Sequence, residues 1–275
     1  MKYLKFIIIF FLNLTLGISQ TKIDSAINIM NIETIHDSTK IQKLFDAASS
    51  LSYENPDSTI KLLDIGLKKI ESSNQIFEKD SIKKLRKNFY RGDYYNMKGI
   101  CFYLLQRNSE CLNMWLKAEK IANIENDTNF LLGTRMNIAI IYSSTGKNKE
   151  ALKIYTDLKK IFETKKDTVG MITASLNIST IIKEKDTIIQ LMNSALELAY
   201  EFKGKNLLTN IYAILSATYL DTNSKNTFNL SKSKESLDSL IHYATKQKNN
   251  EYIKFYYSTI SDYYILKNQY DLALI

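Results

Sequence analysis

The stretch MNIAIIYSSTGKNKEALKIY, residues 136–155, predicts how this chain folds. It places Ala139 three residues before Tyr142 and then, after a polar turn, Ala151 four residues before Tyr155. Positions three or four apart lie on one face of a helix, so each half presents a small residue beside an aromatic one. Two helices approach closely where both side chains are small, and the rings fill the space beside that contact. The stretch therefore predicts two antiparallel helices.

The same arrangement recurs along the chain. The small residues of successive first helices are Gly99, Ala139, Ser179, Ser216 and Ser261, at spacings of 40, 40, 37 and 45 residues. This pattern resembles the tetratricopeptide repeat (TPR), whose minimal unit is about 34 residues, and longer helices would account for the wider spacing. The resemblance implies an all-α, right-handed superhelical solenoid of antiparallel helix pairs. It fixes function poorly, because such arrays bind many unrelated partners.

The composition also favours helices over an all-β fold. Of 275 residues, 8 are Gly and 1 is Pro, so the chain has few turn-formers and few helix breakers. Hydrophobic residues make up 45% of the chain, which is enough for a continuous core. The length suits one solenoid, whose stability adds up repeat by repeat.

Residues 1–19 have the features of a secretory signal peptide. Lys2 and Lys5 make a basic start, and residues 6–18 form an almost wholly apolar run. Gly17 and Ser19 are small residues at the two positions that a signal peptidase reads. The apolar run is shorter than the roughly 20 residues of a spanning helix, and an uncleaved anchor is the alternative. We expect an exported chain that begins at Gln20, on the periplasmic or extracellular side of the inner membrane.

The remaining sequence divides into a lead-in segment, residues 20–37, and a repeat array, residues 38–275. The first, weaker unit of the array places Ala47 against a second helix that carries Thr59, Leu63 and Gly66. The fourth of the later units contains a polar insertion, residues 221–233, which we expect to form a surface loop.

The last repeat is truncated in this sequence. Ala273 has the place of the small residue in a second helix, yet the sequence stops at Ile275. Complete arrays end in a polar capping element, so we expect this chain to be a fragment of a longer protein.

The two cysteines, Cys101 and Cys111, are expected to be unpaired although export would permit a disulfide. Cys111 has the small-residue position opposite Gly99, so we expect it to be buried. Cys101 follows Gly99 by two residues, which turns it away from that contact and makes a bridge geometrically poor.

The formal charge is +8, and basic residues are densest between 79 and 91. The members of this basic stretch are Lys79, Lys83, Lys84, Arg86, Lys87 and Arg91. It fits a solvated helix face or, alternatively, a site for an acidic partner or an anionic lipid surface. Nucleic acid is not an expected partner of an exported chain.

The sequence contains no recognisable catalytic, metal or cofactor site. Its two histidines, His36 and His242, stand beside no nucleophile and in no metal-ligand spacing. Glycine-rich phosphate loops are absent as well. We therefore expect a protein that is not an enzyme and that requires no cofactor.

The resemblance to TPR proteins also implies a concave groove lined by the first helices. The groove positions expected to contact a peptide are Asn96, Met97, Ile100, Tyr103, Met136, Asn137, Ile140, Asn177, Thr180 and Lys183. The same register adds Ala213, Ile214, Ala217, Leu220, Ser258, Thr259, Asp262 and Ile265 in later repeats. The amides of Asn137 and Asn177 can donate to and accept from a peptide backbone, and the rest of the set is mixed apolar and hydroxylic. Only Lys183 is basic among the first helices' groove positions, so a clamp for a C-terminal carboxylate is not implied.

These observations predict a non-catalytic scaffold for protein–protein interaction, with a protein or peptide partner of unknown identity. The alternative is the extracytoplasmic sensor region of a larger membrane-bound signalling protein. Exported arrays that resemble this one often precede one transmembrane helix and then a histidine kinase or a helix-turn-helix regulator. A run of roughly 20 apolar residues downstream would favour the sensor.

Overall fold

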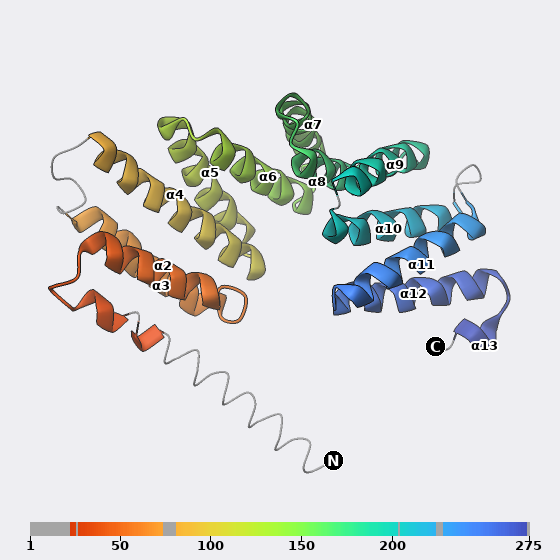
Figure 1. Cartoon of the computed structure of the whole chain (residues 1–275), viewed down its shortest axis with the longest axis horizontal. Coiled ribbons are helices and arrows are strands. Elements are labelled where there is room, and N and C mark those ends of the chain that lie inside the picture. The colour runs from red at the N-terminus through yellow and green to blue at the C-terminus, as the bar shows by residue number, and fades with distance from the viewer. Residues whose placement is uncertain (1–22, 26, 74–80, 203, 224–227, 274–275) are drawn as a thin grey trace, which may run out of the picture. The chain divides into compact units, whose positions relative to one another are not determined.

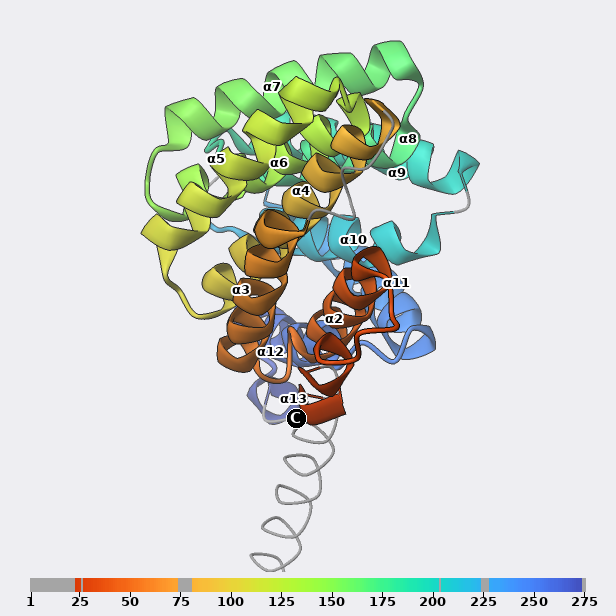
Figure 2. The same cartoon turned by 90° about the vertical axis from the view of Figure 1, so that its left-hand side faces the viewer.

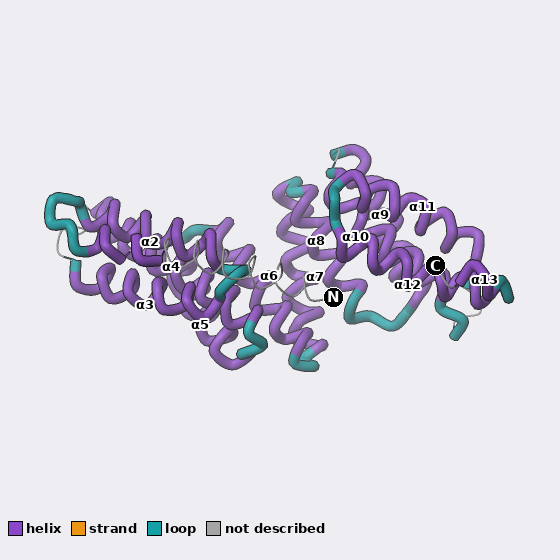
Figure 3. Tube along the Cα trace, turned by 90° about the horizontal axis from the view of Figure 1, so that it is seen from below, coloured by secondary structure: helices purple, strands orange, loops and turns teal. Residues whose placement is uncertain are grey.

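The computed structural model describes residues 23–25, 27–73, 81–202, 204–223 and 228–273. The expected signal peptide, residues 1–19, lies outside the described residues. The chain forms two compact units, residues 1–141 and 142–275. The described residues are helices joined by short loops, without a strand (Figure 3). No helix among them has both the length and the apolar character needed to cross a membrane.

The first unit contains the N-terminal helices of the chain, which form consecutive antiparallel pairs (Figure 1). Its elements are α2 (Asp37–Leu51), α3 (Pro56–Ser72), α4 (Ser81–Leu104), α5 (Asn108–Glu125) and most of α6 (Thr128–Ser144). Helix α2 packs on α3, α3 packs on α4, and α4 packs on α5, and α2, α3 and α4 are seen from the side in Figure 2. Asn55 caps α3 by accepting from Ser58 N, and Pro56 has the first helical position, where its missing N–H costs no hydrogen bond.

The core of the first pair depends on a close approach between α3 and α4. Tyr94 is completely buried, and its hydroxyl donates to the carbonyl oxygen of Ile41 at 2.6 Å. A Cβ atom on Gly66 would lie 2.1 Å from Tyr94 Cε1, so only glycine fits there. Ile23 and Met30 of the lead-in segment pack against this core, in line with the helical residues at 23–25 and 27–30.

The small residue opposite Thr59 is Ala48, one position later than the expected Ala47. Ala48 is completely buried, and Thr59 Oγ1 donates to its carbonyl oxygen at 3.4 Å, whereas Ala47 is half-buried. In the next pair, a Cβ on Gly99 would first meet the indole of Trp115, at 2.3 Å from Nε1. The nearest neighbour of Gly99 across the pair is therefore the ring of Trp115, and not Cys111 as the sequence predicted.

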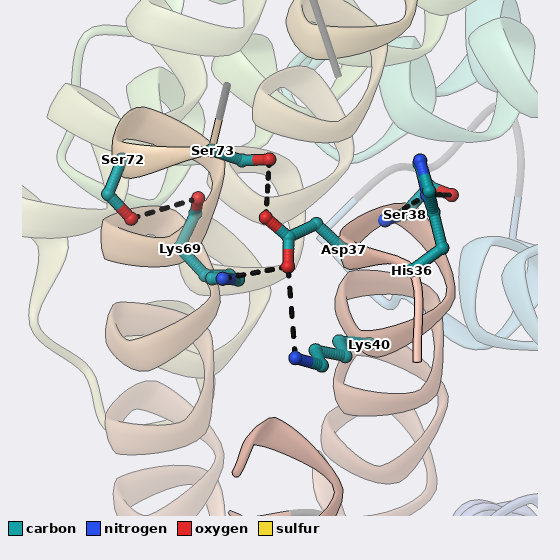
Figure 4. Close-up of polar contacts among 7 residues, drawn as sticks. All are labelled: His36, Asp37, Ser38, Lys40, Lys69, Ser72 and Ser73. Atoms are coloured by element: carbon teal, nitrogen blue, oxygen red, sulfur yellow. Dashed lines mark hydrogen bonds and ion pairs between the residues drawn. The ribbon is translucent and has the colours of Figure 1, made fainter. Parts of the chain in front are cut away.

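A buried carboxylate joins the start of α2 to the end of α3 (Figure 4). Asp37 Oδ2 accepts from Ser73 Oγ at 2.6 Å, and Asp37 Oδ1 lies 2.7 Å from Lys69 Nζ and 3.9 Å from Lys40 Nζ. Burial by itself would raise the pKa of Asp37, but the hydrogen bonds from Lys69 and Ser73 and the charges of both lysines lower it overall. The first turn of α2 is thereby fastened to its partner helix.

The second unit begins within α6 and continues as further helix pairs. Its elements are α7 (Asn148–Lys165), α8 (Thr168–Ser179), α9 (Lys185–Glu201), α10 (Lys205–Leu220), α11 (Leu230–Lys246), α12 (Asn250–Leu266) and α13 (Tyr270–Ala273). Helix α8 ends at Ser179 and is short for a first helix, with 12 residues. One core of Ile, Leu, Ala, Met and Tyr side chains extends from α8 to α12.

Small hydroxyl residues fasten the last two pairs of this unit. Ser233 Oγ donates to the carbonyl oxygen of Ser216 at 3.0 Å, and Ser233 is completely buried. The expected loop of residues 221–233 is therefore too long at its far end, because α11 already begins at Leu230. In the last pair, Ser261 Oγ donates to the carbonyl oxygen of Ala273 at 2.6 Å, as the small-residue register predicts.

Candidate functional site

Seven of the expected groove residues lie on α4 and α6 in the first unit. The α4 residues are Asn96, Met97, Ile100 and Tyr103, and the α6 residues are Met136, Asn137 and Ile140. Met136 is buried, and Met97 packs against the core of the first pair, so both contribute mainly to packing. Tyr103 is exposed, and its ring lies 6.2 Å from that of Trp115.

Two asparagines on these helices bind each other. Asn137 Nδ2 donates to Asn96 Oδ1 at 3.2 Å, and the main-chain carbonyl of Asn96 accepts from Trp115 Nε1 at 3.2 Å. Both asparagines are half-buried. Their remaining polar atoms, Asn96 Nδ2 and Asn137 Oδ1, are one donor and one acceptor. A peptide unit has one N–H donor and one carbonyl acceptor, and these two atoms could bond to both. The hydrogen bond between Asn137 and Asn96 was not predicted from the sequence.

The other three expected groove residues belong to the second unit. Asn177 is a half-buried residue of α8. Thr180 is the C-cap of α8, and Lys183 lies in the turn before α9. Because α8 ends at Ser179, these two side chains stand on a turn and not on a groove-lining helix.

A hollow with a volume of about 560 Å³ lies between α10 and α12 in the second unit. Six of the eight positions that the register assigns to these two helices line it, namely Ala217, Leu220, Ser258, Thr259, Asp262 and Ile265. Asp221, Thr222, Phe255 and Leu266 complete its wall. The hollow thus combines apolar side chains, hydroxyls and two carboxylates along the faces of two successive first helices.

The two carboxylates of this hollow differ in their surroundings. Asp221 Oδ2 lies 2.9 Å from Lys185 Nζ, and the hydrogen bond from Lys185 lowers the pKa of Asp221. Asp262 is exposed, and no ion pair reaches it from the described part of the chain. A partner bound here would therefore meet a negative charge beside the apolar side chains of Leu220 and Ile265.

The basic stretch of residues 79–91 is partly neutralised from within the protein. Lys87 is buried, and its Nζ donates to the carbonyl oxygen of Glu71 at 3.2 Å. Arg91 Nη2 lies 2.5 Å from Glu71 Oε1. The side chains of residues 79–86 lie outside the described residues. Lys87 and Arg91 therefore fasten α4 to α3 and do not form a free basic surface.

The cysteines and histidines have surroundings that suit structural roles. Cys101 and Cys111 are unpaired and completely buried. Burial raises the pKa of Cys101 to about 11 and that of Cys111 to about 12, so both remain thiols at neutral pH. His36 caps α2 by accepting from Ser38 N, and the ring of His242 packs edge-on against Tyr243. Among the described residues, no three potential ligands converge to hold a metal ion.

A second cavity, not predicted from the sequence, lies in the first unit. Its walls come from α4, α5 and the residues that begin α6, and they combine Phe89 and Phe130 with the carboxylates of Asp93, Glu125 and Asp127. The one sequence signal that could have indicated it is the spacing of Phe89 and Asp93, which places an aromatic ring and an acid on one face of a basic helix.

No family model matches the sequence, and no curated protein matches it either. The structure is similar to the crystal structure of BtubC (BKLC) from P. vanneervenii, with a TM-score of 0.62, 13% sequence identity, and coverage of 85% of this chain and 91% of that chain. A kinesin-light-chain-like protein of Podosopora anserina with nearly identical TPR-like repeats matches with a TM-score of 0.42, 11% identity, and coverage of 86% and 99%. A variant of that protein gives a TM-score of 0.42, 10% identity, and coverage of 85% and 99%. The chain has a TPR-like, all-α fold of antiparallel helix pairs.

Proposed function

We propose that this chain is a non-catalytic scaffold that binds an extended segment of a partner protein along the face of its first helices. The observation that supports the proposal is the hollow of about 560 Å³ between α10 and α12. It lies where the repeat register places groove positions, and ligand sites are concave surfaces with apolar walls and a few polar groups.

The chemistry of the hollow suits a segment with alternating side chains. Leu220, Phe255 and Ile265 offer apolar surface, while Ser258 and Asp262 offer hydrogen-bonding groups on α12. In the first unit, the remaining donor of Asn96 and the remaining acceptor of Asn137 supply a matching pair for one peptide unit. A strand-like segment exposes such groups at every residue, because its backbone makes no internal hydrogen bonds.

A matched pair of substitutions tests the proposal. Ser258 lies in the hollow on α12, and Ser194 is another exposed serine, on the second helix α9. Peptides would be selected from a displayed random library against the full chain. Ser258→Trp should fill the hollow and weaken binding of the selected peptides by about tenfold or more, while Ser194→Trp should leave it within about twofold. Equal binding to both variants, or a library that yields no binder, would refute the proposal.

We also propose that the chain is exported, on the basis of the basic start, the apolar run and the small residues at 17 and 19. N-terminal sequencing of protein from an extracytoplasmic fraction should find Gln20 first. An intact Met1 on cytoplasmic protein would contradict export.

The same groove could serve a sensor region of a larger signalling protein. The downstream reading frame distinguishes that alternative from the scaffold.

A further inference from the structure

The second cavity lies where α4, α5 and the start of α6 meet in the first unit. It has a volume of about 130 Å³, and its apolar walls are Phe89, Ile121, Ala122 and Phe130. Gly92 makes room for one of these walls, because a Cβ atom on it would lie 2.9 Å from Phe130 Cε1. The cavity therefore depends on the absence of a side chain at this position of α4.

Three carboxylates also line this cavity, and none has a cation as its partner within the described part of the chain. Glu125 Oε1 accepts from Asn88 Nδ2, and Asp127 Oδ1 accepts from Phe130 N at 3.0 Å. No hydrogen bond or ion pair from the described residues reaches Asp93. These three carboxylates stand together in a chain whose formal charge is +8. Asp93, Glu125 and Asp127 are half-buried, and a carboxylate that is partly removed from water is stabilised by a cation, so a cationic ligand suits this cavity.

The aromatic walls decide what kind of cation fits. Phe89 lines the cavity and is 56% exposed, so its ring is accessible to a ligand. A ring face attracts a cation through its quadrupole, and the attraction grows when water is excluded. A metal ion would instead need oxygen ligands that converge, and no such group of three exists among the described residues.

We infer that this cavity receives the guanidinium group of an arginine side chain from a partner protein. A guanidinium is planar, stacks on aromatic faces and presents five donors to carboxylate oxygens, whereas an ammonium is a compact and strongly hydrated charge. The cavity, with a volume of about 130 Å³, has room for several waters or for one small planar group such as a guanidinium. The inference rests on the proposed function in one respect, that the occupant belongs to a partner polypeptide.

The test uses the full chain and a short synthetic peptide, acetyl-Gly-Gly-Arg-Gly-Gly-amide, titrated by ligand-observed NMR. The matched peptide carries citrulline, which has the shape of arginine without its charge. The arginine peptide should bind saturably, and the citrulline peptide should bind at least about tenfold more weakly. A lysine peptide should also bind more weakly than the arginine peptide.

Variants locate the binding. Asp93→Asn and Phe89→Ala should each weaken the arginine peptide by about fivefold or more. Asp157→Asn, on an exposed position of α7, makes the same change of charge and should leave binding within about twofold. Ser258→Trp should also leave binding of the arginine peptide unchanged. The proposal of a groove at α10 and α12 and the proposal of an arginine site in this cavity can therefore be refuted independently. Thermal melts by circular dichroism establish that each variant is folded.

Four results would overturn the inference. They are equal binding of the citrulline peptide, tighter binding of the lysine peptide, equal effects of Asp93→Asn and Asp157→Asn, and the absence of saturable binding up to about 20 mM peptide.

Discussion

Replacing Gly66 with alanine should destabilise the first helix pair, although alanine is the better helix former. The added Cβ would lie 2.1 Å from Cε1 and 2.6 Å from the hydroxyl oxygen of Tyr94. That ring is completely buried, and its hydroxyl is held by the carbonyl of Ile41, so it has little room to move. Overpacking of this kind costs about 1–3 kcal/mol, and losing the tyrosine hydrogen bond would add about 1 kcal/mol.

Gly133→Ala on α6 is the matched control for this substitution. Gly133 is exposed, and a Cβ atom there would meet nothing within 4 Å. Only helix propensity then acts, and it should stabilise the protein by about 0.5–1 kcal/mol. The same gain operates at Gly66, so the net loss there should be about 1–3 kcal/mol.

Urea unfolding of the full chain, followed by circular dichroism, measures both effects. The midpoint should fall for Gly66→Ala and rise for Gly133→Ala. The double variant Gly66→Ala, Tyr94→Leu removes the ring that the new methyl group meets, and its loss should be smaller than the sum of the two single losses. A midpoint for Gly66→Ala that equals or exceeds that of the unmodified chain would refute the close approach of α3 and α4.

Three further predictions concern titratable groups. Asp37→Asn should lower the free energy of unfolding by about 1–2 kcal/mol at neutral pH. Lys69 and Ser73 lower the pKa of Asp37 against the effect of burial, so the ionised carboxylate stabilises the folded chain at pH values above its unfolded pKa near 3.8. In urea melts this stabilisation should vanish as the pH falls through the lower pKa of the folded state. Burial and the charge of Asp127 raise the pKa of Asp93 to about 6, so the unmodified chain should lose stability as the pH rises from about 4 through about 6. Asp93→Asn should remove that loss in the same melts, and a flat difference between the two proteins would contradict it. Cys101 and Cys111, whose pKa values burial raises to about 11 and about 12, should react with a thiol reagent at pH 8 only after unfolding, and rapid labelling of the native chain would contradict their burial.

The sequence pattern is sufficient to predict the helix pairs, because it reflects a steric rule. Small residues recur where helices approach, and the bond from Ser261 to Ala273 lies where the spacing places it. The pattern does not distinguish adjacent small residues, however. Ala47 and Ala48 are equivalent by type, and only the contact with Thr59 across the pair shows that Ala48 is the buried one.

The two candidate sites differ in how far they could be predicted from the sequence. The positions around the hollow of α10 and α12 follow from the register, because positions three or four residues apart lie on one face of a helix. The early end of α8 was not predicted, and it places Thr180 and Lys183 on a turn. The cavity beside Asp93 could not be derived from local spacing. Its walls come from three helices, and the burial that raises the pKa of Asp93 exists only after these helices pack.

The central claim is that partner segments lie along the first helices. A crystal structure of the full chain bound to a library-selected peptide tests this claim most directly. The account predicts an extended peptide in the hollow between α10 and α12, with a side chain against Leu220 and Ile265 and a polar contact to Ser258 or Asp262. A peptide bound to the second helices, with this hollow left open, would contradict the account.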